Sequence, residues 1–331
     1  MSEAKVDAIR RIGREELVAM WDGLRQPYHD DYLALYSTVY GGVVTDPVLM
    51  MVPIDDHMVH RGDGIFETFK CVEGALYNLD GHLSRLERST RDLAFTLPVT
   101  MEALRQIVLE TIRIGGQQDC AVRMFVSRGP GSFGVNPYDC PAAQLYVAVT
   151  RLVKPFMTRN PEGAAVRTST VPIKHPFFAG VKNCNYLNNV LMKKEAVDAK
   201  VDFVVAFDER GRLGEGATEN IGVVTREGVL TFPCLDGILM GTTMVRVMEL
   251  AEVVVAEGLL KEVRFGDLER QDIETAREII IAGTTTDVTH VRTFDGKPIG
   301  NGTQGPVFKR LSELLLADIH SNPVMRTPVF R

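Results

Sequence analysis

A short charged segment with two prolines, RLVKPFMTRNPEG at residues 151–163, interrupts the chain near its middle. Proline cannot continue a helix or a central strand, and charged residues and glycine favour an exposed connection. Each of the two parts that it separates has about the 150 residues of one typical domain. The sequence therefore predicts an N-terminal domain at 1–150, a linker at 151–163 and a C-terminal domain at 164–331.

Both parts mix strand-like and helix-like segments. Before the linker, strands are predicted at 32–40, 49–52, 65–72, 76–79, 121–127 and 144–149, and helices at 4–24, 82–94 and 101–114. After it, strands are predicted at 201–207 and 220–225, and helices at 244–257 and 306–317. This irregular mixture indicates an α+β or mixed α/β fold.

The charged residues are spread along the chain and form no tail. With 43 acidic and 37 basic residues the net charge is −6, which argues against nucleic acid as the main partner. No run approaches the roughly 18 apolar residues of a membrane span. The first residues, MSEAKVDAIRRIGREEL, are charged throughout and do not resemble a secretory signal. Five scattered cysteines without a C-x-x-C pair fit reduced thiols, so we expect a cytoplasmic protein that does not bind a membrane.

Two further patterns lack the context that their function needs. GPGSFG at 129–134 matches the glycine pattern of dinucleotide sites, but the following VNPYDCP cannot open the helix that such a site requires. His57 and His60 have no third ligand at a recognisable spacing. We therefore expect neither a dinucleotide site nor a metal site.

Lys182 lies in GVKNCNYLNN (180–189), among small and amide residues and without an acidic neighbour in the sequence. Most lysines are solvated surface residues. A lysine held away from water, however, loses its proton more readily and can attack an aldehyde. Lys182 is therefore the candidate nucleophilic amine.

Glu215 lies between two glycines in LGEGATENIGVV (213–224), just before an apolar strand. Glycine lets a backbone approach a bound group closely. The segment is either a polar turn between strands or the place where a carboxylate points at a nitrogen atom of a ligand.

Two threonine-containing loops are candidate anion sites. Gly241, Thr242 and Thr243 come directly before a predicted helix, whose first N–H groups can bind a phosphate; ordinary capping by threonine is the alternative. A buried strand runs into Gly283 and is followed by Thr284, Thr285 and Thr286, which suit an anionic ligand or form a β-turn.

In their order and separation these segments resemble the class IV aminotransferases, the fold-type IV pyridoxal-phosphate enzymes. The resemblance extends from about residue 52 to residue 315 and includes HRGDGIFETFK (60–70), HLSRLERS (82–89), VKNCNYLNNVLMKKEA (181–196), GEGATEN, ILMGTTMVRV and AGTTTDVTHV. It implies a smaller N-terminal α/β domain, a larger β-rich C-terminal domain and pyridoxal 5'-phosphate as the cofactor.

The resemblance also assigns roles to residues. Lys182 matches the Schiff-base lysine and proton shuttle, and Glu215 matches the partner of the pyridine nitrogen. The other cofactor contacts that it implies are Arg85, Thr242, Thr243 and Thr284 at the phosphate and Tyr186 at the 3-oxygen. The substrate contacts are Phe66, Arg123, Arg128, Thr284 and Thr285.

The motifs on the substrate side resemble different branches of the family. The stretch GSFGV after Arg128 lacks the Arg-x-His pair typical of D-amino-acid enzymes, and RMFVSRGPGSFGVNP resembles the branched-chain pattern. The spacing from Lys182 to Asn185 is closer to the D-amino-acid and lyase branches. The phosphate loop reads GTTM where many members have GITR, which removes a basic side chain but keeps the backbone donors.

The resemblance thus implies transfer of an amino group between a branched-chain or D-amino acid and a 2-oxo acid. The alternatives are an aminodeoxychorismate lyase and an (R)-selective amine transaminase. Family members usually dimerise, so a homodimer is expected.

Overall fold

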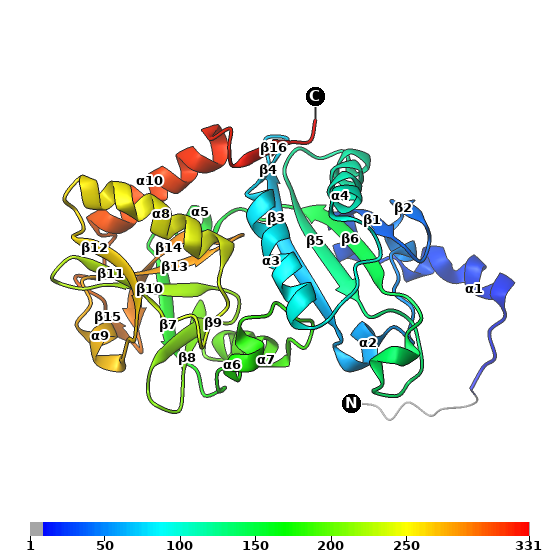
Figure 1. Ribbon diagram of the computed structural model, residues 1–331, viewed down its shortest axis with the longest axis horizontal. Helices are drawn as coiled ribbons and strands as arrows, with labels where there is room; N and C mark the ends of the chain where they lie inside the picture. The colour runs from blue at the N-terminus through cyan, green and yellow to red at the C-terminus, as the bar shows by residue number, and fades with distance from the viewer. Residues whose placement is uncertain (1–8, 331) are drawn as a thin grey trace.

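The computed structural model describes residues 9–330, which form two β-sheets side by side (Figure 1). One sheet has seven strands and the other nine, and helices pack on both. The predicted mixture of helices and strands is confirmed.

The first sheet is antiparallel throughout, in the order β16-β4-β3-β5-β6-β1-β2. Its strands are β1 (Tyr32–Ser37), β2 (Gly42–Val44), β3 (Gly64–Val72), β4 (Ala75–Tyr77), β5 (Cys120–Ser127), β6 (Gln144–Arg151) and β16 (Arg326–Pro328). Helix α3 (Leu79–Asp92) packs on β3, and α4 (Met101–Gly115) packs on β1 and β6. Leu86 of α3 and Ile112 of α4 are buried in the resulting core, since both helices turn an apolar face to the sheet.

The second sheet is mixed, in the order β12-β11-β10-β13-β14-β7-β8-β9, with β15 beside β14. Its strands are β7 (Ala164–Thr168), β8 (Phe203–Phe207), β9 (Leu213–Gly216), β10 (Asn220–Val224), β11 (Val229–Pro233), β12 (Glu262–Gly266), β13 (Glu278–Gly283), β14 (Asp287–Phe294) and β15 (Lys297–Pro298). Helices α8 (Thr242–Ala256) and α10 (Pro306–Ser321) pack on it. All five residues of β10 are buried, which explains the run without charged residues from Ile221 to Val224.

Short helices complete the fold. They are α1 (Arg14–Met20), η1 (Trp21–Leu24), η2 (Pro27–Asp31), η3 (Pro47–Leu49), α2 (His57–Arg61), η4 (Pro137–Asp139), α5 (Phe156–Arg159), α6 (Pro176–Ala179), α7 (Leu187–Asp198) and α9 (Arg270–Glu274). Helix α7 packs on β8, next to the segment that contains Lys182. No helix among residues 9–330 is long and apolar enough to cross a membrane.

Two predicted elements differ from the structure. The strand predicted at 49–52 is wrong: the Asp46 carboxylate accepts from Val48 N at 3.3 Å and, with Pro47, starts the 3-10 turn η3 instead. The helix predicted at 4–24 is reduced to α1 and η1, and residues 9–13 are not helical. Its first part, residues 4–8, lies outside the described residues. No side chain of α1 is buried, so tertiary packing does not extend this helix.

The linker region contains more structure than its composition suggests. Strand β6 extends to Arg151, and α5 inserts buried Phe156 into the core of the second sheet. The C-terminal strand β16 returns to the first sheet, where it pairs with β4 (Figure 1). The division at 1–150, 151–163 and 164–331 stays a prediction.

Candidate active site

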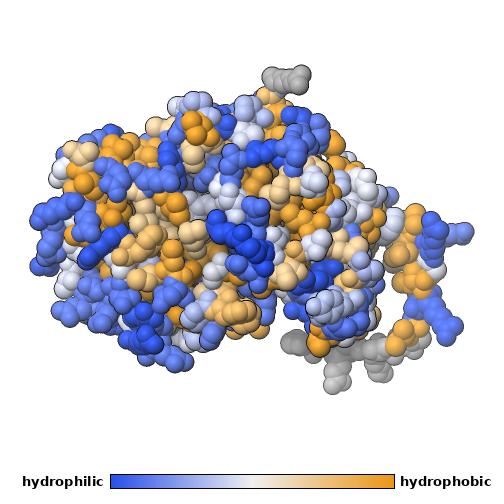
Figure 2. Space-filling view, viewed as in Figure 1, coloured by the Kyte–Doolittle hydropathy of each residue, from blue (hydrophilic) through white to orange (hydrophobic). Residues whose placement is uncertain are grey.

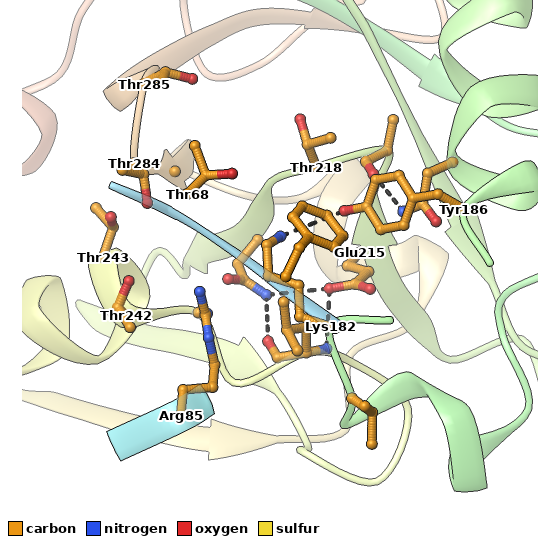
Figure 3. A pocket seen from close by; sticks show the side chains of 18 of the residues that line it. Thr68, Arg85, Lys182, Tyr186, Glu215, Thr218, Thr242, Thr243, Thr284 and Thr285 are labelled. Atoms are coloured by element: carbon orange, nitrogen blue, oxygen red, sulfur yellow. Dashed lines mark hydrogen bonds between the residues drawn. The ribbon is translucent and has the colours of Figure 1, made fainter. Parts of the chain in front are cut away.

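A cavity of about 460 Å³ lies between the two sheets, a size typical of small-molecule sites. Its walls come from β3, β5 and α3 on one side and from β9, β10, α8 and the loops after β7 and β13 on the other. Of the eleven residues to which the resemblance assigns a cofactor or substrate role, ten line it: Phe66, Arg85, Arg123, Lys182, Tyr186, Glu215, Thr242, Thr243, Thr284 and Thr285. In Figure 3, Arg85, Thr242, Thr243 and Thr284 gather on one side, Tyr186 and Glu215 on the other, and Lys182 between.

Lys182 is held where the two sheets meet. Its carbonyl oxygen accepts from Phe66 N at 2.9 Å, and Asn183 forms a bridge with Ile65 of β3. Its Nζ lies 3.5 Å from the Tyr186 hydroxyl and 4.6 Å from the centre of the Phe66 ring. Burial, assisted by the positive charge of Arg85, lowers the pKa of Lys182 to about 8. The amine is therefore available as a nucleophile or base near neutral pH.

Glu215 lies on β9 and faces the same cavity. Its Oε2 accepts from Leu239 N at 3.0 Å and from Asn220 Nδ2 at 3.5 Å. Burial raises the pKa of Glu215 to about 7, although the Leu239 N–H and the two nearby lysines act against this shift. A carboxyl group in this state can take or share a proton with a ligand nitrogen.

The two glycines beside Glu215 are explained by packing. A Cβ on Gly214 would lie 2.8 Å from the Ile173 side chain, and one on Gly216 would lie 2.9 Å from the Glu219 carboxylate. The interpretation that they give access to a ligand is therefore not needed.

Arg85 is anchored by a buried carboxylate that sequence reasoning missed. Glu67 on β3 is fully buried and accepts from Arg85 Nε at 2.7 Å and Nη2 at 2.6 Å. Burial by itself would raise the pKa of Glu67, but Arg85 and His82 hold it at about 2. Arg85 Nη1 donates to the Met240 carbonyl at 3.2 Å. Two of its five N–H groups remain for a ligand.

His82 connects this carboxylate to the start of α8. Its Nδ1 lies 2.8 Å from Glu67 Oε2, and its Nε2 lies 3.2 Å from the Thr242 hydroxyl. Burial lowers the pKa of His82, so the ring is neutral. Because a carboxylate only accepts, Nδ1 carries the proton and Nε2 accepts from Thr242. The hydroxyl of Thr242 therefore donates within the protein. The hydroxyl of Thr243 donates to no group among residues 9–330.

Helix α8 begins two residues earlier than predicted, with Gly241 as its N-cap. The backbone N–H groups of Thr242 and Thr243 therefore belong to the first turn, where no helical carbonyl pairs with them. In the loop after β13, which also lines the cavity, the hydroxyl of Thr286 is buried and has no hydrogen-bond partner among the described residues. Free donors from both segments suit a bound phosphate.

Arg128 is not brought to this cavity. Its Nε and Nη2 each lie 3.2 Å from the Asp63 carboxylate, and its guanidinium stacks on Phe95. It lines a second hollow of about 390 Å³ instead. Arg123 does line the cavity, and its Nη1 lies 3.4 Å from the Thr150 hydroxyl.

A family model described as amino-transferase class IV matches residues 64–294. The chain belongs to the class IV aminotransferases. This aminotransferase is 40% identical over 295 residues to a chloroplastic D-amino-acid transaminase of Arabidopsis thaliana, covering 88% of the chain and 78% of that relative. It is 33% identical to a putative branched-chain-amino-acid aminotransferase of Methanocaldococcus jannaschii, covering 79% and 89%.

A solved structure is also similar to this aminotransferase. It is the branched-chain amino acid aminotransferase of T.th., complexed with N-(5'-phosphopyridoxyl)-L-glutamate. The two structures have a TM-score of 0.81 and 28% identity, and the match covers 90% of this chain and 99% of that one.

The GTTM loop of this aminotransferase has a structural explanation. Met244 is fully buried in the core under α8, so its side chain points away from the cavity. Loss of a basic residue at this position therefore leaves the backbone donors of the loop in place.

Glu67 and His82 hold Arg85 and Thr242 from behind the cavity wall, and each has a signal in the sequence. Glu67 is a charged residue inside an apolar strand, and His82 lies three positions before Arg85, on the same helical face. Lys174 lines the cavity, but nothing in VPIKHPFF distinguishes it from a surface lysine. Among residues 9–330 no three histidines, cysteines or carboxylates are grouped as metal ligands.

Proposed function

We propose that this aminotransferase uses pyridoxal 5'-phosphate, bound covalently through Lys182, to move an amino group between an amino acid and a 2-oxo acid. The observation that carries the proposal is that one cavity presents a partner for each end of that molecule. Lys182 supplies an amine of lowered pKa, and Glu215 a carboxyl group for the ring nitrogen. Arg85, the start of α8 and the loop at Thr284 supply phosphate donors.

The chemistry can be assigned to named groups. When bound, pyridoxal phosphate supplies an aldehyde for the substrate amine and a ring that accepts electrons from the substrate Cα. Lys182 Nζ would accept the proton that leaves the substrate Cα and pass it to the carbon of the bound cofactor that carries the substrate nitrogen, which its lowered pKa permits near neutral pH. The Glu215 carboxyl group keeps the ring nitrogen protonated. The Tyr186 hydroxyl, 3.5 Å from Lys182 Nζ, holds the 3-oxygen.

The substrates are proposed to be a branched-chain or D-amino acid and a 2-oxo acid. Relatives named for both amino-acid classes support this range. In this proposal the loop from Gly283 to Thr285 holds the substrate carboxylate through backbone N–H groups and hydroxyls. Support comes from the cavity lining, which includes this loop, Arg123 and Phe66, with Phe66 beside Lys182. Arg128 is paired with Asp63 outside the cavity, so it is not proposed to contact the substrate.

A Lys182→Ala variant tests the assignment. We expect it to lose all turnover and the visible absorbance of the cofactor-loaded protein, because the amine proposed to bind the cofactor aldehyde and to carry the proton is removed. Lys309→Ala, on the exposed face of α10, is the matched control and should keep both. Normal turnover by Lys182→Ala would refute the role of this lysine. A wild type that consumes no 2-oxo acid with L-amino acids, D-amino acids or amines would refute transamination itself.

We further propose a homodimer in the cytoplasm. Helices α6 and α7 expose Phe177, Phe178, Leu187 and Val190 near the cavity, an unusual density of apolar side chains for a free surface. Figure 2 shows hydrophobic residues on the surface where these helices lie. The free cysteines Cys71, Cys120, Cys140, Cys184 and Cys234 are consistent with a reducing compartment.

A further inference from the structure

A second lysine lies at the edge of the cavity. Lys174, in the loop between β7 and α6, lines both the 460 Å³ cavity and the adjoining 390 Å³ hollow. Its Nζ lies 4.6 Å from the centre of the Tyr186 ring, and Lys182 Nζ lies 5.6 Å from the same point. Lys174 is therefore on the Tyr186 side of the cavity. Figure 3 shows Tyr186 away from Arg85, Thr242 and Thr243, the proposed phosphate donors.

The ammonium group of Lys174 has no anionic partner within the described part of the chain. It takes part in no ion pair within 4.0 Å and donates no hydrogen bond. Unlike Lys174, the nearby arginines have partners within the protein. Arg85 pairs with Glu67 and Arg128 pairs with Asp63, while Arg61 donates to the carbonyl groups of Phe133 and Gly134.

A half-buried cation without a partner favours an anion in the space beside it. Burial penalises the charged ammonium group and lowers the pKa of Lys174, while the Glu215 carboxylate acts in the opposite direction. A bound carboxylate would remove this penalty through a charge-assisted hydrogen bond. Arg123 also forms no ion pair with any described residue, but its side chain is exposed, so water screens its charge more strongly.

We propose that Lys174 binds the distal carboxylate of a dicarboxylic substrate and so selects dicarboxylic over monocarboxylic substrates. The inference rests on the proposed function, in which the loop from Gly283 to Thr285 holds the carboxylate next to the reacting carbon. A dicarboxylic amino acid or 2-oxo acid then directs its second carboxylate past Tyr186 to Lys174.

The test uses the holoenzyme and a Lys174→Met variant, which keeps the length of the side chain and removes its charge. We expect KM for 2-oxoglutarate to rise about 10- to 100-fold, because one hydrogen bond to a charged group is lost. KM for pyruvate and the kcat values with both acids should stay within about twofold. Lys174→Arg should restore much of the difference. Lys309→Met is the control for a lost surface charge and should change neither KM.

Calorimetric binding of unreactive acids gives a readout independent of turnover. Glutarate should bind the wild type more tightly than butyrate, and Lys174→Met should remove that preference. Equal losses for both acids, no loss for either, or a selective loss only in Arg123→Met would each overturn the proposal. Failure of transamination would appear as an inactive wild type, whereas the glutarate preference would still report on Lys174.

Discussion

Lys182 and Glu215 lie in one cavity, and burial moves their pKa values toward each other. Removing water disfavours both charged forms, so the pKa of Lys182 falls to about 8 and that of Glu215 rises to about 7. Both side chains can therefore exchange protons near neutral pH, as acid–base catalysis at this site requires.

This shift makes the stability of the cofactor-free protein depend on pH. The Glu215 pKa rises from 4.5 in the reference state to about 7 in the fold, so its stabilising contribution is complete below pH 4.5 and is lost as pH rises through 7. Between pH 5 and pH 8 we expect the free energy of unfolding of the wild type to fall by about 2 kcal/mol more than that of the Glu215→Gln variant.

Denaturant unfolding of both proteins at the two pH values measures this difference. Glu87→Gln, a change to an exposed glutamate on α3, is the control and should follow the wild type. If Glu215→Gln lost as much stability as the wild type, the carboxyl group would not carry the shift.

At the scale of elements, three pieces of secondary structure build the phosphate side of the cavity. Helix α3 places His82 and Arg85 on one face, β3 supplies Glu67 between them, and His82 reaches the first residue of α8. Because this chain of hydrogen bonds joins the two sheets, it sets the position of Arg85 relative to the start of α8.

The C-terminal strand is a second link between the sheets. β16 pairs with β4, Val329 is buried in the core of the first sheet, and Arg113 Nε donates to the Val329 carbonyl at 2.7 Å. Removal of residues 324–331 should lower the free energy of unfolding by about 2–4 kcal/mol, because it exposes apolar core and the edge of β4.

Chemical unfolding of the truncated protein checks this. Removal of residues 1–20 is the comparison, since no side chain of α1 is buried, and it should change stability by less than about 0.5 kcal/mol. Similar effects of the two deletions would show that β16 contributes nothing beyond an exposed terminus.

At the scale of the whole molecule, the surface formed by α6 and α7 is the proposed contact between subunits. We expect sedimentation to show twice the mass of one chain, and Val190→Glu, at a position 57% exposed, to shift the protein toward a monomer because it would bury a charge in the interface. Val324→Glu, at an exposed position away from these helices, is the control. A wild-type monomer at micromolar concentration would contradict the proposal.

Long periodic segments were predicted well from the sequence. The strands at 65–72 and 121–127 and the helix at 101–114 are confirmed within a residue or two, because apolar spacing over many residues reports which face is buried. The short strands β2, β9, β15 and β16 were missed, and so were the longer β7, β11, β12 and β14. The four short strands contain two to four residues each, too few for a periodic signal. Of these four, β2, β9 and β15 pair with the strand just before them in the chain, and β16 pairs with the distant β4.

The sequence by itself determined the residues that carry local chemistry: a lysine without acidic neighbours, a glutamate before an apolar strand, and threonines where a helix starts. Only the tertiary structure decided which partners these groups contact. Glu67 forms an ion pair with Arg85, and Asp63 forms one with Arg128 outside the cavity. Lys174 has no ion-pair partner among the residues described. The physical reason is that burial and ion pairing depend on contacts between residues far apart in the chain, as His82 and Thr242 show at a separation of 160 positions.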